Sequence, residues 1–291
     1  MLLYSDLHLD ASPCAIDYGI VAGDICDSVS GICIPGNHDY WYDYYGLNDW
    51  VYGWLSLDKP TLLGTMWTDL GYNGTMFSSY SADFWEGVAF VDKEFSKVVS
   101  SATAYMLDYR YGKVDGTRMH FSFGLNEYFK FLQLVAEMPS EACRIVTHHS
   151  PASRAMIQRF YGIRPYDRNM LLSHAFHSSA LCRVMSYENV RSTVLKHGLT
   201  WAFGHTHERV DLLIDFGKFV RNNPTWVYGV LGEHADDLEQ ELIYGGYIER
   251  REFGSPFVES PGMIRIVSNP RGYSRIPGLD EWGNEYKGIE I

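Results

Sequence analysis

The chain has 291 residues, of which 46% are hydrophobic and 21% charged. These values are typical of one large globular domain that buries a substantial core. The formal net charge is −12, and this acidic balance argues against a large footprint on duplex nucleic acid, because the phosphates would be repelled. A bound divalent cation could still make one site locally positive.

The cysteines and the N-terminal residues bear on the compartment. The five cysteines, Cys14, Cys26, Cys33, Cys143 and Cys182, are odd in number and show no Cys-x-x-Cys spacing. Reduced thiols in a cytoplasmic enzyme are therefore expected. The N-terminus lacks a basic segment followed by a long apolar one, and no apolar run approaches the ~20 residues of a transmembrane helix. We expect a cytoplasmic protein without a membrane partner.

Short apolar runs bounded by Gly or Pro recur along the chain, and each ends at a polar motif. They occupy residues 2–5, 18–22, 31–35, 144–147 and 200–203. Runs of this length and composition predict buried strands of an α/β fold. In such folds the carboxyl ends of the strands carry the ligand-binding side chains.

Apolar residues at helical spacing predict three helical regions, within residues 88–105, 125–135 and 181–195. Gly198 is a plausible stop for the third. Residues 208–262 differ, since they hold an acidic run at 233–241 and Gly- and Pro-containing stretches. We interpret them as an elaboration between two strands, within a single domain that spans residues 1–291.

Each predicted strand is followed by side chains that bind metals. The motifs are Asp6-Leu7-His8, Gly23-Asp24, Gly36-Asn37-His38-Asp39, His148-His149 and Gly204-His205-Thr206-His207. Residues two apart in a strand point the same way, so Asp6 and His8 could hold one cation together. The two oxygens of the Asp24 carboxylate could bridge two cations.

The donors divide into two sets. The first is Asp6, His8, Asp24 and His207, and the second is Asp24, Asn37, His205 and one histidine of the 148/149 pair. Oxygen and nitrogen donors without a thiolate suit Mn²⁺, Fe, Zn²⁺ or Ni²⁺ better than Ca²⁺, and we expect two divalent cations, with Mn²⁺ first. Two cations ~3.5–4 Å apart would acidify a bridging water and hold the oxygens of a phosphoryl group.

His38 is left over by this division. It could donate a proton to the leaving oxygen, with Asp39 orienting its ring. Asn37 could instead be a turn residue and Asp39 a helix cap, since any one of these motifs is more often structural than functional. The structural explanation would have to hold for all the motifs together, in order, each at a strand end, and this favours the metal site.

In this order the motifs Asp-x-His, Gly-Asp-x-x-Asp, Gly-Asn-His-Asp, His and Gly-His-x-His resemble the calcineurin-like metallophosphoesterase superfamily. Residues 64–69, 107–110, 146–151 and 269–273 resemble segments of a bacterial and phage branch of it. The resemblance implies an α/β fold, a four-layer α/β/β/α sandwich of two mixed sheets with a dinuclear metal site on the strand-end loops. It also implies hydrolysis of a phosphomonoester or phosphodiester by in-line attack of an activated hydroxide.

The chain departs from this pattern in two places. Only residues 25–30 are available to cross between the second and third strands, and six residues span roughly 20 Å at most. We therefore expect a shortened crossover without a helix, and a sheet face that is bare or covered by residues 40–45. The insertion at 208–262 could form a lid, mediate oligomerisation or cover that face.

Some side chains keep two interpretations. The end of the fourth strand favours His148 as the ligand, whereas a His-x-Pro pattern favours His149, and the other histidine would then lie near the phosphate. Arg110 and Arg271 are candidates for bidentate contacts with substrate phosphate, or for surface salt bridges.

The expected function is a metal-dependent phosphohydrolase that acts on a small phosphoester or nucleotide. A nuclease acting on single-stranded or cyclic-phosphate nucleic acid is one alternative, and a non-catalytic scaffold of the same fold is another. Tyr40, Trp41 and Trp67 would form a stacking wall for an aromatic substrate, or belong to the core.

Overall fold

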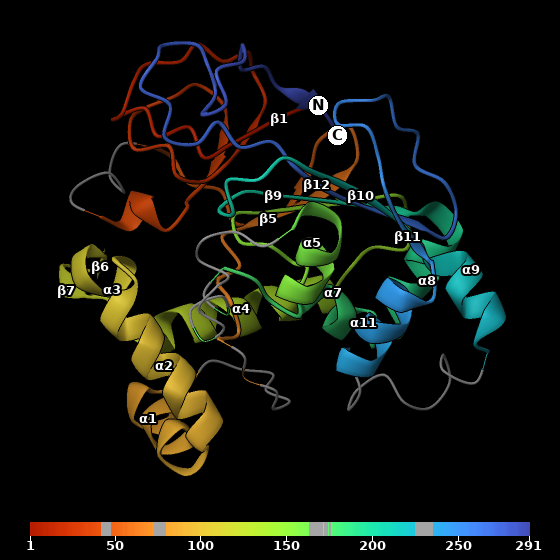
Figure 1. Cartoon of the computed structure of the whole chain (residues 1–291), viewed down its shortest axis with the longest axis horizontal. Helices are drawn as coiled ribbons and strands as arrows, with labels where there is room; N and C mark the ends of the chain where they lie inside the picture. The colour runs from red at the N-terminus through yellow and green to blue at the C-terminus, as the bar shows by residue number, and fades with distance from the viewer. Residues whose placement is uncertain are drawn as a thin grey trace.

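The computed structural model describes residues 1–41, 48–70, 72, 80–162, 171, 174, 176–224 and 235–291. It is an α/β structure in which two mixed β-sheets pack face to face and helices cover the other face of the larger sheet (Figure 1). Both chain ends lie beside the smaller sheet (Figure 1). None of the described helices is both long and apolar enough to cross a membrane.

The smaller sheet has four strands in the order β13-β1-β2-β3. Its strands are β1 Leu2–Ser5, β2 Ile20–Ala22, β3 Ile32–Ile34 and β13 Ile289–Glu290. β1, β2 and β3 run parallel, and β13 pairs antiparallel with β1. The carboxyl ends of three strands therefore meet at one edge, as the sequence predicts.

The larger sheet has seven strands in the order β11-β10-β12-β9-β8-β5-β4. Its strands are β4 Gly53–Ser56, β5 Pro60–Gly64, β8 Arg144–Thr147, β9 Leu199–Phe203, β10 Val210–Asp215, β11 Ile248–Arg250 and β12 Met263–Ser268. The central strands β5, β8, β9 and β12 are parallel, and the strands outside them are antiparallel. A small hairpin of β6 Lys113–Val114 and β7 Thr117–Arg118 is separate.

Alternation along the strands builds the layers. On the central strands one residue of each pair faces the helices, as Ile145 and Trp201 do, and its neighbour faces the smaller sheet, as Val146 and Ala202 do. Leu3 of β1 meets them from the other side. Strands that are buried on both faces have continuous apolar sequences, and they can therefore be predicted from the sequence.

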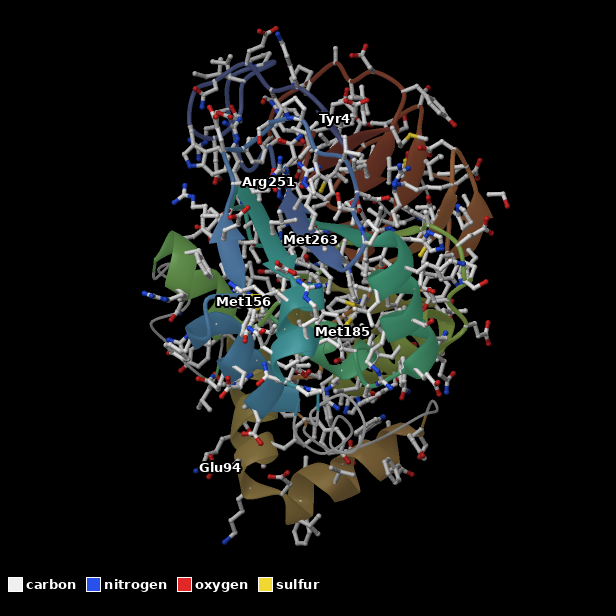
Figure 2. All side chains as sticks on the ribbon, turned by 90° about the vertical axis from the view of Figure 1, so that its right-hand side faces the viewer. Tyr4, Glu94, Met156, Met185, Arg251 and Met263 are labelled. Atoms are coloured by element: carbon white, nitrogen blue, oxygen red, sulfur yellow. The ribbon has the colours of Figure 1, made fainter. Side chains whose placement is uncertain are left out.

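The helices lie on the far side of the larger sheet or extend away from it (Figure 1). They are α1 Ala82–Val91, α2 Lys93–Tyr105, α3 Asp108–Tyr111, α4 Phe121–Ala136, α5 Arg154–Tyr161, α7 Ala180–Val184, α8 Glu188–His197, α9 Phe216–Asn222 and α11 Ala235–Tyr244, whereas the short helix η1 His38–Tyr40 follows β3 of the smaller sheet. In Figure 2, Glu94 on α2 and Tyr4 on β1 lie at opposite ends of the molecule.

The predicted helical regions are confirmed with changed boundaries. The region at 88–105 is two helices, because the carboxylate of Asp92 accepts hydrogen bonds from the backbone N–H groups of Glu94 and Phe95 and begins a new helix. The third region is α7 followed by α8. It ends at Gly198, which has φ 83°, a conformation that favours glycine.

The crossover at residues 25–30 contains no helix, as predicted. The outer face of the smaller sheet is covered by loops instead, through side chains such as Leu7, Ile25 and Tyr286. The helical layer expected on this face is therefore absent from the described residues, because the crossover is too short to form it. Tyr40 does not cover this face but packs in the helix-side core, and residues 42–45 lie outside the described part of the chain.

The insertion at 208–262 extends the larger sheet. β10 and β11 pair antiparallel in it, and α11 packs against α5 and α7. Its helices α9 and α11 lie away from β1 (Figure 1), whereas residues 254–259 lie beside both chain ends, where they line one pocket with Met1, Glu290 and Ile291. None of its described residues belongs to the apolar cluster on the outer face of the smaller sheet, and the single-domain organisation stays a prediction.

Candidate metal centre

The predicted ligands lie just beyond the carboxyl ends of five parallel strands that belong to both sheets. Asp6, Asp24 and Asn37 follow β1, β2 and β3, while His148 and His205 follow β8 and β9. These ends meet because the two sheets pack face to face with their parallel strands contributing to one rim. Segments up to about 200 positions apart in the chain are brought together in this way.

The first predicted set is assembled in the structure. The ligand atoms of Asp6, His8, Asp24 and His207 all lie within 4.8 Å of one another. Nε2 of His8 is 3.1 Å from Nε2 of His207 and 3.8 Å from Oδ2 of Asp24. This group offers carboxylate oxygens and imidazole nitrogens at one point.

The second set lies on the other side of Asp24. Oδ1 of Asn37 is 2.8 Å from Nε2 of His148 and 2.8 Å from Nδ1 of His205. Oδ1 of Asp24 is 3.4 Å from Nε2 of His148. One oxygen of Asp24 therefore faces each group, which is the arrangement needed for a carboxylate shared by two cations.

Asn37 and His148 show that a cation fits the second group. Asp108 orients the amide of Asn37 by accepting a hydrogen bond from its Nδ2 at 2.7 Å. The carbonyl of Ala22, 2.9 Å from Nδ1 of His148, can only accept and so keeps the proton on Nδ1. Two lone pairs, on Asn37 Oδ1 and His148 Nε2, then face each other at 2.8 Å. This contact is repulsive unless a cation lies beside both atoms.

Of the adjacent histidines, His148 has the geometry of a ligand to the second group. His149 packs its ring against Trp67, with centroids 5.0 Å apart, and against His205, at 4.1 Å. His149 remains within reach, since its ligand atom and those of His148 and His205 lie within 4.8 Å of one another. The strand-end alignment of the sequence thus favours the histidine that faces Asp24.

The backbone around the ligands adopts a conformation that is rare for residues other than glycine. Asp6, His8, Asp24, His205 and His207 have φ of 50°, 43°, 50°, 65° and 48°. The prediction that strand geometry aligns Asp6 with His8 is therefore wrong, since both residues follow β1, although their side chains still converge. Such positive φ values cost free energy and cluster at functional sites, where surrounding contacts maintain them.

The glycines of the motifs are needed because the ligands crowd the backbone. A Cβ atom on Gly36 would lie 2.2 Å from Oδ1 of Asp24, and one on Gly204 would lie 2.7 Å from Oδ2 of Asp6. Any other residue at these positions would displace a carboxylate oxygen. The glycines thus allow the strand ends to approach one another closely enough to share ligands.

Burial dominates the electrostatics of the site. It raises the pKa of Asp6 to about 6 and holds the pKa of Asp24 well above its usual value. It also lowers the pKa of His148 to about 3 and that of His205 well below its usual value. Asp6 Oδ2 and His205 Nε2 are buried without a hydrogen-bond partner. Buried carboxylates beside neutral imidazoles need positive charge, and a divalent cation supplies it.

His38 lies at the edge of this site. Its Nε2 is 2.9 Å from the hydroxyl of Tyr273, and its ring stacks on Trp41 with centroids 3.7 Å apart. Its backbone N–H donates to Oδ1 of Asp24 at 2.8 Å. Burial lowers the pKa of the imidazole to about 3.

The prediction that Asp39 orients the ring of His38 is wrong. The carboxylate of Asp39 is fully buried and accepts hydrogen bonds from the backbone N–H groups of Ile25, Cys26 and Gly36, at 3.0, 2.9 and 2.8 Å. It fastens the two loops that carry Asp24 and Asn37. The position of Asp39 next to His38 in the sequence suggested a catalytic partner. In the structure its carboxylate instead accepts hydrogen bonds from backbone N–H groups of the neighbouring loops.

Neither arginine is placed to bind substrate phosphate. Arg271 is fully buried, and its guanidinium donates to the carbonyls of Leu7, Ser12 and Leu279 at 2.7, 2.8 and 3.1 Å. Arg110 is exposed and donates to the carbonyl of Ala104 at 2.9 Å. Both predictions are corrected, because backbone carbonyls take up the guanidinium groups, buried ones at Arg271 and an exposed one at Arg110.

Asp108 and Tyr273 are two site residues that sequence reasoning did not assign, although it noted their segments. Asp108 accepts from Asn37 and from Nε1 of Trp41, at 2.7 and 3.0 Å. Tyr273 stacks on His8, with centroids 4.1 Å apart. The only sequence signal was the resemblance of residues 107–110 and 269–273 to the superfamily branch.

A cavity of about 320 Å³ opens beside these groups. Its wall contains Asp24, Asn37, His38, Trp41, Tyr105, Met106, Leu107, Asp108, Phe176, His205, Thr206, His207 and Tyr273. The lining combines predicted metal ligands with aromatic and aliphatic side chains. None of the described residues between 208 and 262 lines it, so the interpretation of that insertion as a lid gains no support from them.

Comparison of the chain with protein-family models, curated proteins and solved structures finds no match. The function is therefore argued from the site itself. The described residues offer two adjoining groups of oxygen and nitrogen donors, a carboxylate that faces both, and a histidine that lines a cavity.

Proposed function

We propose that this chain is a metal-dependent phosphohydrolase of the calcineurin-like metallophosphoesterase superfamily, working with two divalent cations. The observation that carries the proposal is the position of Asp24. Its Oδ2 is 3.8 Å from His8 and its Oδ1 is 3.4 Å from His148, so one carboxylate faces both ligand groups. The opposed lone pairs of Asn37 and His148 add support, because they need a cation.

The fold is consistent with this assignment. Two mixed sheets present parallel strand ends to the site, and the motif order along the chain is that of the superfamily. In this member the fourth, helical layer would be replaced by loops on the smaller sheet. The short crossover accounts for that replacement without moving Asp24 or Asn37 from their strand ends.

The cations, when bound, would acidify a water molecule and neutralise the oxygens of a phosphoryl group. The residues of the chain would orient the metal ligands and protonate the leaving group. Asp6 and Asp24 are oriented by the backbone N–H groups of His205 and His38, at 2.6 and 2.8 Å. His38, held by Tyr273 and Trp41, donates a proton to the leaving oxygen, since the charge of a nearby phosphate favours the imidazolium.

A small phosphoester is the substrate class that the cavity supports. Its volume of about 320 Å³ is at the lower end of the range for small-molecule sites. Trp41, Tyr105 and Phe176 give the lining an aromatic character that suits a nucleotide base or another flat group. Mn²⁺ is the first candidate ion, followed by Fe, Zn²⁺ and Ni²⁺.

The test is turnover of p-nitrophenyl phosphate and bis-p-nitrophenyl phosphate by chelator-treated protein before and after Mn²⁺ is restored. Activity should be absent without metal and return with it. The same assay on labelled single-stranded and cyclic-phosphate oligonucleotides separates the nuclease alternative. Equal inactivity of both preparations across a broad panel of phosphoesters would refute the proposal, and metal content below one equivalent would favour a scaffold.

His38→Ala tests the role of the proton donor. Turnover should fall by about 10²–10⁴-fold while both metals stay bound, because His38 is assigned to proton transfer and not to either ligand group. Metal content and turnover are measured on the same sample. Loss of one metal in this variant would show that His38 is a ligand.

A further inference from the structure

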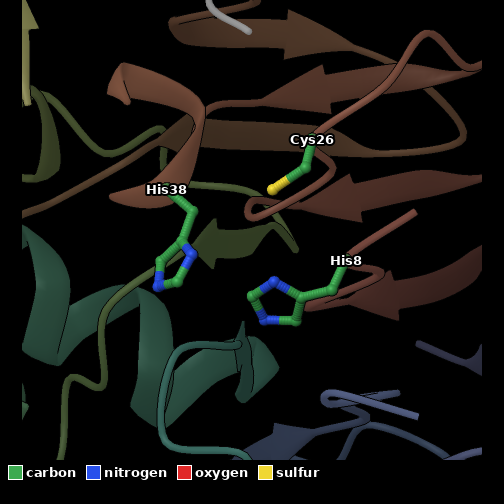
Figure 3. A group of neighbouring side chains, drawn as sticks. All are labelled: His8, Cys26 and His38. Atoms are coloured by element: carbon green, nitrogen blue, oxygen red, sulfur yellow. The ribbon is translucent and has the colours of Figure 1, made fainter. Parts of the chain in front are cut away.

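A third group of metal-ligating side chains adjoins the two already described. Ligand atoms of His8, Cys26 and His38 lie within 4.8 Å of one another. The three residues come from the loops after β1, β2 and β3, and their side chains point toward a common point (Figure 3). None of the other cysteines belongs to such a group among the described residues.

Each histidine of this group has one ring nitrogen engaged elsewhere. Nε2 of His8 faces His207, and its Nδ1 is buried without a hydrogen-bond partner. Nε2 of His38 lies against the hydroxyl of Tyr273. The two Nδ1 atoms are therefore the donors left for a ligand shared with Cys26.

The backbone directs Cys26 into this position. Cys26 has φ 60°, which is unfavourable for a side chain of this kind, and its thiol group is buried with the residue only 3% exposed. Its backbone N–H is held by Asp39 at 2.9 Å. A buried thiol that faces two imidazoles in a maintained, unfavourable conformation indicates a binding role more than a packing one.

We propose that His8, Cys26 and His38 form a further site for a soft divalent cation, with Zn²⁺ as the first candidate, and that this site shares His8 with the first ligand group. One sulfur and two nitrogen donors suit Zn²⁺, whereas the oxygen-containing pair of sites suits harder ions such as Mn²⁺. The bond that forms is between the cation and the cysteine sulfur, and the thiol proton is released to water. A fourth position is left for a water molecule.

Occupation of this site would inhibit the enzyme, and this consequence rests on the proposed function. A neutral imidazole coordinates through one nitrogen because the other keeps its proton, so His8 cannot serve both sites as a neutral ligand. His38 would be turned from proton transfer to coordination. A soft cation would thus withdraw one ligand and the proton donor together.

The site is tested by adding Co²⁺ to protein kept in excess Mn²⁺ and recording thiolate-to-cobalt charge-transfer absorption. A band that saturates at one equivalent is expected in the wild type. It should disappear in Cys26→Ser and persist in Cys33→Ser, a matched variant at another buried cysteine. Absence of the band in the wild type, or its persistence in Cys26→Ser, would overturn the proposal.

Two further measurements make the outcome independent of whether Cys26→Ser folds and whether the enzyme is active. X-ray absorption of wild-type protein carrying Zn²⁺ beside Mn²⁺ should show one sulfur neighbour at about 2.3 Å, and a zinc shell without sulfur contradicts the site. If phosphoesters are hydrolysed, the Zn²⁺ concentration for half inhibition should rise at least about 10-fold in Cys26→Ser. Equal inhibition of both proteins would refute the inhibitory consequence and leave the spectroscopic result to decide the site.

Discussion

The larger sheet is covered by helices and holds a core rich in Trp and Phe, whereas the smaller sheet has strands of two to four residues and loops on its outer face. The smaller sheet nevertheless supplies Asp6, His8, Asp24 and Asn37 to the candidate metal centre. Apolar burial stabilises the first region. The second must keep several ligands in unfavourable backbone conformations with smaller apolar clusters around them.

Buried polar groups supplement the small apolar clusters on the two faces of the smaller sheet. Arg271 binds the carbonyls of three loop residues, and Asp39 binds the N–H groups of three others. Hydrogen bonds are directional, so they determine where a loop runs more narrowly than apolar contacts do. We therefore expect substitutions in the core of the larger sheet to lower stability without changing the ligand geometry. Substitutions in the polar network of the smaller sheet should change both properties.

Asp24→Ala should have the largest effect, because this carboxylate faces both ligand groups. Both metals should be lost, and turnover should fall by at least about 10⁴-fold, more than the loss of a proton donor costs. Metal analysis after dialysis and phosphoester turnover measure this. Asp27→Ala, an exposed carboxylate in the same loop, should change neither. Two metals retained in Asp24→Ala would remove Asp24 as the shared ligand.

Phe131→Ala probes the larger sheet, since Phe131 is fully buried in its helix-side core. The free energy of unfolding should fall by about 3–5 kcal/mol, while the folded fraction keeps both metals. Urea denaturation and metal analysis separate the two effects. Phe90→Ala, at a side chain that is 87% exposed, should cost about 0.5 kcal/mol or less. A weakened metal site in folded Phe131→Ala would break the proposed separation.

Arg271→Ala probes the smaller sheet. It leaves the buried carbonyls of Leu7 and Ser12 without their donor, so the free energy of unfolding should fall by about 3 kcal/mol. Metal affinity should fall as well, because Leu7 lies between Asp6 and His8. Arg110→Ala, at an exposed guanidinium, should leave both unchanged. Lower stability with unchanged metal affinity would show that the two properties are not coupled here.

Asp108→Ala should have the smallest of these effects. Asn37 would lose the acceptor that orients its amide, and affinity for the second metal should fall by about 10–100-fold. Competition with a chromophoric chelator measures this affinity. Asp83→Ala, an exposed carboxylate in the first turn of α1, is the control. An unchanged affinity in Asp108→Ala would mean that the ring contacts of Asn37 suffice to orient it.

Much of this architecture could be predicted from local pattern. The runs at 2–5 and 144–147 are strands with those bounds, and helical spacing located α4 and α8. The periodicity of apolar residues in strands and helices depends only on residues close together in the chain, so it can be recognised in a single sequence. The break at Asp92 was missed because a continuous apolar face masks a capping residue within it.

The sequence by itself determined which donor types follow the strands and that the second crossover had no room for a helix. The tertiary structure decided what each buried polar side chain contacts. His148 faces Asn37 because the carbonyl of Ala22 orients its ring, and Asp39 serves backbone amides instead of His38. Such partners can lie more than 100 positions away in the chain. Buried polar groups must nevertheless find a hydrogen-bond partner. Periodicity records which face of an element is buried, but only the packed fold determines which donor meets which acceptor there.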